Sequence, residues 1–456
     1  MNKSLLLLSG CILFGCSSKK ISPLNNVYQA DKIESLTLEG DSNISTPPSF
    51  QKIIQIEGLE SLVHNGFQKN NSWKVQLAKV NVVRTELGLT ISGSKPSIEG
   101  TISWSEGREK TRESGFIEKT IPSWKGGASF NWEIDVWGKW KLLKESAKMH
   151  LIEAEYIKES SRIVFVNEIA NAWILLAAQK EELDILKKSI NSHQKSINFY
   201  EKKVQVGEEN NATLSRQKVA FDQLLLEEAS LLRRYEITKL RLHYLTSNKL
   251  NSDIPKIAKL SEIKLPILPK VFPTNALKSR PDLKAKEAKI RENLYLEKSM
   301  KYDLYPSLSF QTSGFILSSN LSEPFEQWKA SIGPVLNLPI WNPRKKSELS
   351  VVSAQNEVFK EEWRASINLA IEEIESATRS FLMSKNELSI ALRSSQQSSS
   401  ILAVTKAKLE AGLVSQLELL EDERQFLDSN RKSIKSRLRV FQFALDLTKS
   451  LGIQWA

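Results

Sequence analysis

The pattern of apolar and polar positions changes its period abruptly within the stretch SFNWEIDVWGKW, residues 129–140. Its first half alternates, which predicts a β-strand, because successive side chains of a strand point to opposite faces. The apolar positions are Phe130, Trp132, Ile134 and Val136, and the polar positions between them are Asn131, Glu133 and Asp135. After Gly138 the spacing becomes helical and stays so for about 65 residues. A strand with one apolar and one polar face thus leads almost directly into a very long helix.

The helical part of the chain keeps an apolar residue at nearly every seventh position, which is the pattern of a coiled-coil seam. In the first long helix the seam comprises Ile169, Leu176, Leu183, Ile190, Ile197 and Val204. A second helix repeats this register 205 residues later, with Ile374, Phe381, Leu388, Ser395, Leu402 and Leu409. The glycines that follow the two seams, Gly207 and Gly412, have the same offset. A register shared over so long a stretch indicates that the chain is an internal duplication.

Each half also contains two strand-like segments ahead of its long helix. These hairpins are predicted at about 97–137 and 307–341, with a polar loop between the strands of each. A strand needs about 9–11 residues to cross a bilayer, and these segments are long enough. Four strands cannot close a barrel, and an open edge cannot lie in lipid. If the strands span a membrane, several copies must share one barrel; a soluble sandwich with one solvated face is the alternative.

The two long helices are predicted at about 139–206 and 344–411, and at about 1.5 Å per residue each reaches roughly 100 Å. Gly207 and Gly412 suit the left-handed conformation that ends many helices, and a shorter helix returns after each. The predicted organisation is a signal peptide at 1–15, an anchor and lead-in segment at 16–50, a first repeat at 51–250, a proline-rich connector at 251–276 and a second repeat at 277–456.

The N-terminus reads MNKSLLLLSGCILFGCSSKK, with a basic residue followed by an apolar run, which is the pattern of a secretory signal. The end of this run, Leu13-Phe14-Gly15-Cys16, resembles the lipobox of bacterial lipoproteins, in which the cysteine is lipidated and becomes the first residue. Ser17 follows it, and lipoproteins that lack Asp at that position usually go to the outer membrane. An ordinary signal with a chance cysteine is the alternative.

Composition and charge argue against several classes of function. The net charge is +11, but the basic residues are spread among glutamates along the helices, so nucleic acid is not an expected partner. The only other cysteine, Cys11, lies within the signal, so the mature chain would form no disulfide. The four histidines, His64, His150, His193 and His243, show no metal-ligand spacing. With no phosphate loop or nucleophile elbow, we predict no enzyme activity, no cofactor and no metal.

Two motifs connect these patterns to a known family. WEIDVWGK, residues 132–139, and RPDLKAKEA, residues 280–288, resemble the strand-to-helix signature and the second-repeat motif of the TolC-like outer-membrane efflux factors. In the second motif Pro281 is pre-set for a first helical turn, and Asp282 suits the positive end of the helix. Together with the duplication and the lipobox, they make the whole mature chain resemble the lipid-anchored branch of this family.

The resemblance implies a mostly α fold with a β-barrel part. Three copies would form a homotrimer with four transmembrane strands per chain, one twelve-stranded barrel, and an α-barrel made by the long coiled-coil helices. The implied partners are a periplasmic adaptor (membrane fusion) protein, an inner-membrane efflux transporter of the RND type, and outer-membrane lipid around the anchor at Cys16. The chain would lie in the outer membrane and extend into the periplasm.

The resemblance also assigns candidate sites. The apolar face of 130–136 would meet lipid, and the polar face would line the channel. The tips that would dock the adaptor comprise Gly207, Gly412, Leu413, Val414 and Ser415, although helix capping alone explains the two glycines. The carboxylates that close the tunnel would be Glu418 and Glu421, which are three residues apart and hence on one helix face. A further acidic gate residue of the family is matched here by Thr213, and a solvated acidic surface is the alternative.

We therefore predict an outer-membrane exit duct of a tripartite efflux pump, which passively exports small molecules delivered by the transporter. The exit duct of a type I protein-secretion system has the same architecture, and the lipobox favours efflux. A non-conducting, lipid-anchored periplasmic coiled-coil scaffold is an alternative from a different class. The sequence does not name the cargo.

Overall fold

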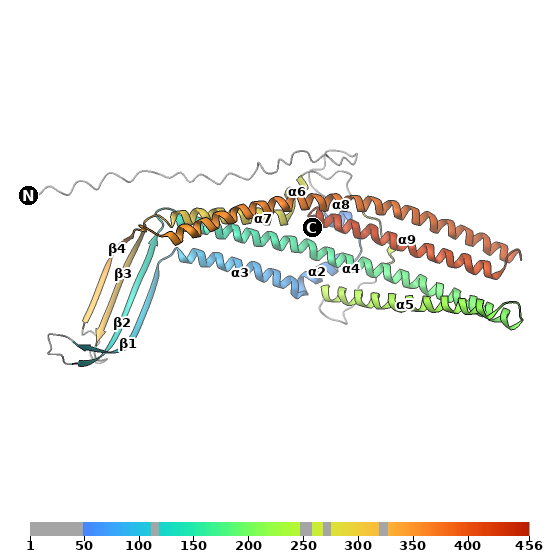
Figure 1. The fold of residues 1–456 in the computed structure, drawn as a ribbon, viewed down its shortest axis with the longest axis horizontal. Coiled ribbons are helices and arrows are strands. Elements are labelled where there is room, and N and C mark those ends of the chain that lie inside the picture. The colour runs from blue at the N-terminus through green and yellow to red at the C-terminus, as the bar shows by residue number, and fades with distance from the viewer. Residues whose placement is uncertain (1–48, 111–117, 247–257, 268–274, 319–326, 456) are drawn as a thin grey trace, which may run out of the picture.

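The computed structural model describes residues 49–110, 118–246, 258–267, 275–318 and 327–455. The predicted signal peptide, Cys16 and almost all of the predicted lead-in segment lie outside these residues. The described part of the chain is strongly elongated (Figure 1). A sheet lies at one end, and long helices run from it to two hairpin tips at the other end.

One antiparallel sheet contains the four strands β1 (Ser97–Lys110), β2 (Glu118–Ile134), β3 (Ser307–Ser318) and β4 (Gln327–Asn337). The strand order follows the chain order, so each half contributes one hairpin and the two hairpins pair through β2 and β3. β1 and β4 each pair on one side only. The sheet of one copy therefore has two edges whose backbone groups meet no partner strand within the described part of the chain.

The two halves repeat the same helices around their hairpins. The first half contains α1 (Phe50–Ile53), α2 (Leu59–Lys69), α3 (Asn71–Gly93), α4 (Lys139–Gln205) and α5 (Asn211–Thr246). The second half contains the 3-10 helix η2 (Leu260–Glu262), α6 (Asn275–Ser279), α7 (Pro281–Tyr302), α8 (Pro343–Glu410) and α9 (Gln416–Ser450). α4 has 67 residues and α8 has 68. The long helices and the four antiparallel strands of the predicted fold class are thus confirmed.

The core lies around the middle of α4. Ile169, Trp173 and Leu176 of this helix are buried, in one cluster with Leu242 of α5 and Phe441 of α9. Among the described helices, α4 alone is long and apolar enough to cross a membrane, but 61% of its apolar window is buried inside the protein. The hydropathy of this window is therefore what a core helix requires, because the helix is covered by α5, α7 and α9.

Candidate channel, junction and gate sites

The strand register shows which side chains share a face of the sheet, because residues directly opposite in neighbouring strands point to the same side. The rows through Phe130, Trp132 and Ile134 contain Ile98, Thr312, Ile332, Phe310, Pro334, Leu308 and Leu336. The rows through Asn131 and Glu133 contain Ser97, Gln311, Gly333, Ser309 and Val335. One face of the sheet is therefore apolar across all four strands, and the other is more polar.

The apolar face is uncovered in a single copy. Ile98 and Ile102 of β1 expose 77% and 83% of their surface, and Trp328 and Ile332 of β4 expose 72% and 74%. A contiguous apolar surface of this kind is unusual on a soluble monomer and marks a place that lipid or another protein covers. The sheet thus has the two-faced character that a membrane barrel requires.

The strand β2 ends at Ile134, two residues before the end of the predicted alternation, so Asp135 and Val136 lie outside the sheet. The Asp135 carboxylate accepts hydrogen bonds from the backbone N–H groups of Trp140 and Lys141, at 3.1 and 3.0 Å. Gly138, directly before α4, has a φ of 83° and no side chain to cap the helix. Asp135 therefore supplies the cap, and its charge suits the positive end of the helix. Because Asp135 caps α4, the chain leaves the sheet two residues earlier than the alternation predicts.

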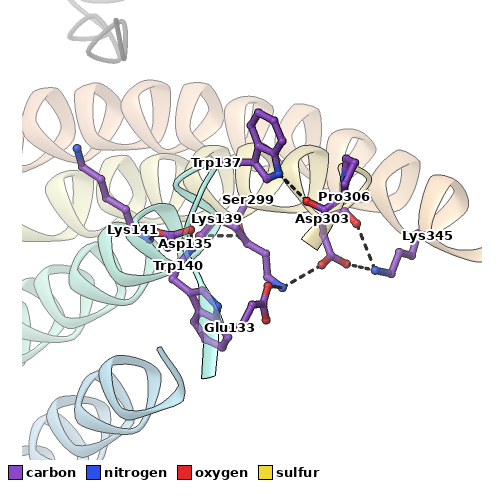
Figure 2. Close-up of polar contacts among 10 residues, drawn as sticks. All are labelled: Glu133, Asp135, Trp137, Lys139, Trp140, Lys141, Ser299, Asp303, Pro306 and Lys345. Carbon is purple, nitrogen blue, oxygen red and sulfur yellow. Dashed lines mark hydrogen bonds and ion pairs between the residues drawn. The ribbon is translucent and has the colours of Figure 1, made fainter. Parts of the chain in front are cut away.

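A network of ion pairs joins the sheet to the helices, as Figure 2 shows. Lys139 Nζ, at the start of α4, lies 2.9 Å from Glu133 Oε1 of β2 and 3.0 Å from Asp303 Oδ1, which follows α7. Asp303 Oδ2 in turn lies 2.5 Å from Lys345 Nζ in the first turn of α8. Four charged side chains thereby connect one strand to three helices. Glu133, which was predicted to line the channel, is the contribution of the strand to this network.

The alternating charges of this junction shift two pKa values, and both groups lie outside the strands. Burial alone would lower the pKa of Lys139, but its hydrogen bonds to Glu133 and Asp303 outweigh burial and raise the pKa. Burial alone would raise the pKa of Asp303, but hydrogen bonds from Lys345 and Lys139 lower it. Lys139 and Asp303 are therefore both held in their charged forms at neutral pH.

Aromatic side chains surround the same junction. Trp137 Nε1 donates a hydrogen bond of 2.6 Å to the carbonyl oxygen of Pro306, just before β3. The ring of Trp137 lies edge-on to Tyr305 with centroids 5.5 Å apart, and Tyr302 lies 5.7 Å from Tyr305. Trp137 thus connects the end of the first hairpin to the start of the second. Amphipathic rings of this kind favour the headgroup zone of a membrane.

The tips of the two helical hairpins have the same backbone motif. Gly207 has a φ of 77° and Gly412 a φ of 71°, values that favour glycine. The N–H groups of the next residues, Glu208 and Leu413, each donate a hydrogen bond of 2.9 Å to the carbonyl five residues earlier. This is the Schellman motif, which ends a helix at a left-handed residue. The geometry explains the two glycines, and a docking role for the tips stays a prediction.

The return helices start with different caps at matching positions. In the first tip Asn210 Oδ1 accepts hydrogen bonds from the backbone N–H and the hydroxyl of Thr213, at 2.8 and 3.1 Å. In the second tip Ser415 Oγ accepts from the backbone N–H of Glu418 at 3.3 Å. Thr213 and Glu418 are 205 residues apart and hence equivalent in the two halves. The second tip presents an exposed carboxylate where the first has a neutral hydroxyl.

Glu418 and Glu421 both line a cleft of about 320 Å³ between α9 and the hairpin of α4 and α5. Arg424 Nη2 lies 2.5 Å from Glu421 Oε1 on the same helix. His193 of α4 lines this cleft as well, and its Nδ1 is buried without a hydrogen-bond partner among the described residues. Burial and then Arg424 lower the pKa of His193, so its imidazole is neutral at neutral pH. The two predicted gate residues thus lie beside a cation and a histidine that the sequence did not connect with them.

A buried ion-pair network joins the two halves, and sequence analysis did not detect it. Arg431 of α9 contacts Glu182 of α4 at 3.3 Å and also Glu227 of α5. Lys435 Nζ lies 3.1 Å from Glu182 as well. Only 9% of the Arg431 side chain is exposed, and its hydrogen bond lowers the pKa of Glu227. The partners lie 204 and 249 residues from Arg431, so no local spacing could reveal them.

The motif at 280–288 is organised by the guanidinium of Arg280. Its Nη2 lies 2.7 Å from Asp282 Oδ2 and 2.8 Å from Glu373 Oε2 of α8. Its Nη1 donates a hydrogen bond of 2.8 Å to the carbonyl oxygen of Ser450 at the end of α9. Pro281 is the first residue of α7, as its fixed φ predicts. Arg280 therefore fastens the start of α7 to α8 and α9, which explains why the motif combines these residue types.

Long helical hairpins that continue into a two-faced sheet with open edges indicate the class of outer-membrane channels that combine strands with long helices. Two segments of the chain, 63–248 and 272–453, match the family model described as outer membrane efflux protein, and the chain belongs to that family. The family consists of transport proteins and not of enzymes, in agreement with the prediction from the sequence.

Several known proteins are similar to the chain at low sequence identity. The outer membrane channel CmeC of Campylobacter jejuni has a TM-score of 0.79 and 20% identity, over 92% of each chain. The solvent efflux pump outer membrane protein SrpC of Pseudomonas putida is 20% identical over 459 residues, which cover 99% of this chain and 97% of SrpC. The pyoverdine export outer membrane protein OpmQ of Pseudomonas aeruginosa is 20% identical over 461 residues, again 99% and 97%. These relatives align with the chain over almost its full length.

Proposed function

We propose that the chain is the exit duct of a tripartite efflux system and that three copies form one channel through the outer membrane. The proposal rests mainly on the four-stranded sheet, which has an apolar face, a more polar face and two unpaired edges. Because lipid does not tolerate an open edge, β1 and β4 must pair with other copies. Three copies supply twelve strands, within the range of roughly 8 to 26 found in bacterial outer-membrane barrels.

An uncovered stripe on α8 supports the same assembly. Val358, Leu369, Met383, Ile390 and Val404 expose between 50% and 69% of their surface. Several of these are separated by seven residues or a multiple of seven, which is the spacing of a coiled-coil seam. A long helix with a second apolar seam needs a second partner helix. We infer that a neighbouring copy supplies it, so that the helices close into an α-barrel.

The far end of the helices carries the predicted docking and gate residues. The periplasmic adaptor would bind at the tips formed by Gly207, Gly412, Leu413, Val414 and Ser415. Leu413 exposes 74% of its surface, which suits an apolar contact with a partner. Glu418 and Glu421 would form the aperture, and threefold symmetry would place six carboxylates around the channel axis. Such a ring attracts cations and repels anions.

The proposal also covers the exported molecules, the lipid anchor of the chain and the origin of its two halves. SrpC is a solvent efflux protein and OpmQ a pyoverdine export protein, and we infer that this chain also passes small molecules supplied by an inner-membrane transporter. Lipid attached to Cys16 would anchor the chain beside the barrel. The halves at 51–250 and 277–456, joined by the connector at 251–276, would derive from one duplicated unit.

Currents through planar lipid bilayers test the channel directly. We expect purified protein to conduct, and we expect Glu418→Gln with Glu421→Gln to reduce the preference for cations, because the ring loses its charge. Glu357→Gln with Glu361→Gln is the matched control, since these carboxylates are exposed on α8 far from the tips. If neither the unaltered protein nor the gate variant carries current, the chain is a scaffold and not a duct.

Chemical cross-linking followed by electrophoresis tests the assembly. The unaltered protein should yield a species of three chains, and Ile390→Glu should yield single chains, because it places a charge in the proposed seam between copies. Arg364→Glu, a charge reversal at an exposed position of the same helix outside this seam, should leave three chains. Cross-linked dimers or tetramers as the largest species would refute the trimer.

Metabolic labelling with radioactive palmitate tests the anchor separately. Label should enter the unaltered protein and be absent from a Cys16→Ala variant, because no other cysteine follows the signal. Label that persists in the variant would remove the anchor from the proposal and leave the channel unaffected.

A further inference from the structure

A histidine and two glutamates converge between α4 and α7, in the part of the helical body near the sheet. His150 Nδ1 lies 3.2 Å from Glu153 Oε2 on the same helix and 3.3 Å from Glu292 Oε2 on α7. One ligand atom from each of the three residues lies within 4.8 Å of the others. The sequence offered no sign of this group, because Glu292 lies in the second half of the chain.

The spacing of these atoms fits a small cation. Zinc binds imidazole nitrogen and carboxylate oxygen at about 2.0–2.2 Å, so neighbouring ligands of a tetrahedral ion lie roughly 3.3–3.6 Å apart. The two distances from His150 Nδ1, 3.2 and 3.3 Å, lie just below and at the lower end of that range. We propose that His150, Glu153 and Glu292 bind a divalent transition-metal ion such as zinc, with water as the fourth ligand.

The helices that carry the three ligands are already held in place. Ser146, one turn before His150 on α4, donates a hydrogen bond of 3.0 Å to the backbone carbonyl of Glu292. The side chains of Glu153 and Glu292 expose only 17% and 18% of their surface, which limits their freedom. Glu86 of α3 lies 3.9 Å from His150 Nε2, the nitrogen on the side of the ring away from the ion; this is an electrostatic contact and not a hydrogen bond.

The ammonium of Lys289 competes with the metal for the same oxygens. Lys289 Nζ lies 2.9 Å from Glu292 Oε2 and 3.6 Å from Glu153 Oε2. A bound cation must displace this ammonium, so the lysine weakens the site without belonging to it. A metal site therefore differs from a simple ion-pair network in one measurable effect: removing the lysine should strengthen metal binding.

Calorimetric titration of the tag-free, full-length protein with zinc chloride, after removal of metals with a chelator, tests the proposal. We expect about one ion per chain. His150→Ala and Glu292→Gln should each weaken binding at least about tenfold, since even changes to residues that only hydrogen-bond a metal ligand cost about 10–100-fold. Lys289→Gln should tighten it. His64→Ala is the matched control, because His64 lies on α2 beside Gln68 and is exposed.

Two outcomes would overturn the site. One is the absence of saturable zinc binding by the unaltered protein. The other is binding that His64→Ala weakens as much as His150→Ala does. Circular dichroism of each variant checks that its helices are intact, and cobalt absorption spectra give a second readout of coordination by His150. The site is independent of conduction, so its failure leaves the proposed channel unaffected.

Discussion

The two long helices have nearly the same length and share their seam register and tip motif, but their surroundings differ. α4 lies between α5, α7 and α9, and its seam residues Ile169 and Leu176 are fully covered. α8 packs on α9 and on part of α7, and leaves residues such as Met383 and Ile390 exposed. The long helix of the first half thus forms the centre of the core, while the long helix of the second half leaves apolar side chains exposed. Equal sequence patterns predict equal helices, but they do not predict equal burial.

Matched truncations in the two seams should give the largest effect. Ile169 and Ile374 are the same residue type at equivalent positions, and Ile169 is fully buried while Ile374 is half-buried. We expect Ile169→Ala to cost about 3–4 kcal/mol and Ile374→Ala about 1–2 kcal/mol, because the cavity left at the covered site cannot relax as easily. Unfolding by urea in detergent measures both values. Equal costs would show that contact with other copies covers α8 as completely as the single chain covers α4.

The buried arginine offers a second comparison between the halves. Arg431 of α9 is equivalent to Leu226 of α5, yet Arg431 is buried against Glu182 and Leu226 exposes 71% of its surface. Arg431→Met should cost about 2 kcal/mol, because it strands the partly buried carboxylates while Lys435 still pairs with Glu182. Leu226→Ala should change the unfolding midpoint little. A larger loss from Leu226→Ala would mean that this leucine lies at an interface in the assembly.

Features that depend on local periodicity were predictable from the sequence. The seam at Ile169 and Leu176, the alternation through Phe130 and Trp132, and the turn at Gly207 each follow from the geometry of one helix, strand or cap. The repeat of each pattern 205 residues later made its register easier to recognise.

Features that depend on two distant segments were not predictable. Arg431 meets Glu182, and Lys139 meets Asp303, across separations that carry no spacing signal. The early end of β2 was not predicted for a related reason. The alternation continues through Asp135, but the carboxylate of Asp135 accepts hydrogen bonds from the first N–H groups of α4. Whether Asp135 continues the strand or caps the helix depends on three-dimensional geometry, which a pattern of apolar and polar positions does not contain.

The caps at the two strand-to-helix junctions allow a finer comparison. α4 is capped by the charged Asp135, whereas α8 is capped by the neutral Asn342, whose Oδ1 accepts from the backbone N–H of Lys345 at 3.0 Å. We expect Asp135→Ala and Asn342→Ala each to cost about 1 kcal/mol. The cost of Asp135→Ala should shrink in about 1 M salt, because screening removes the attraction between a charge and the helix dipole. Thermal unfolding at two salt concentrations measures this, and equal salt dependence would show that hydrogen bonding alone caps both helices.

The smallest expected effect concerns Asp303, which pairs with Lys139 at the start of α4 and with Lys345 at the start of α8. Because Lys345 and Lys139 lower its pKa against the opposing effect of burial, the folded protein binds this proton more weakly than the unfolded chain, in which Asp titrates near about 3.9. The stabilisation is therefore present above that value and is lost as the pH falls through the lower, folded-state pKa. Since 35% of the side chain is exposed, we expect only about 0.5 kcal/mol after solvent screening.

Thermal unfolding of the unaltered protein and of Asp303→Asn, followed from pH 7 to pH 3, tests this sign. The unaltered protein should unfold at the higher temperature at pH 7, and the two midpoints should approach each other below about pH 4. Glu357→Gln provides a control, because Glu357 is exposed and pairs only with Lys360 among the described residues. A difference between Asp303→Asn and the unaltered protein that persists undiminished at pH 3 would mean that Asp303 holds the junction by shape and hydrogen bonding, so that its charge does not couple the two halves.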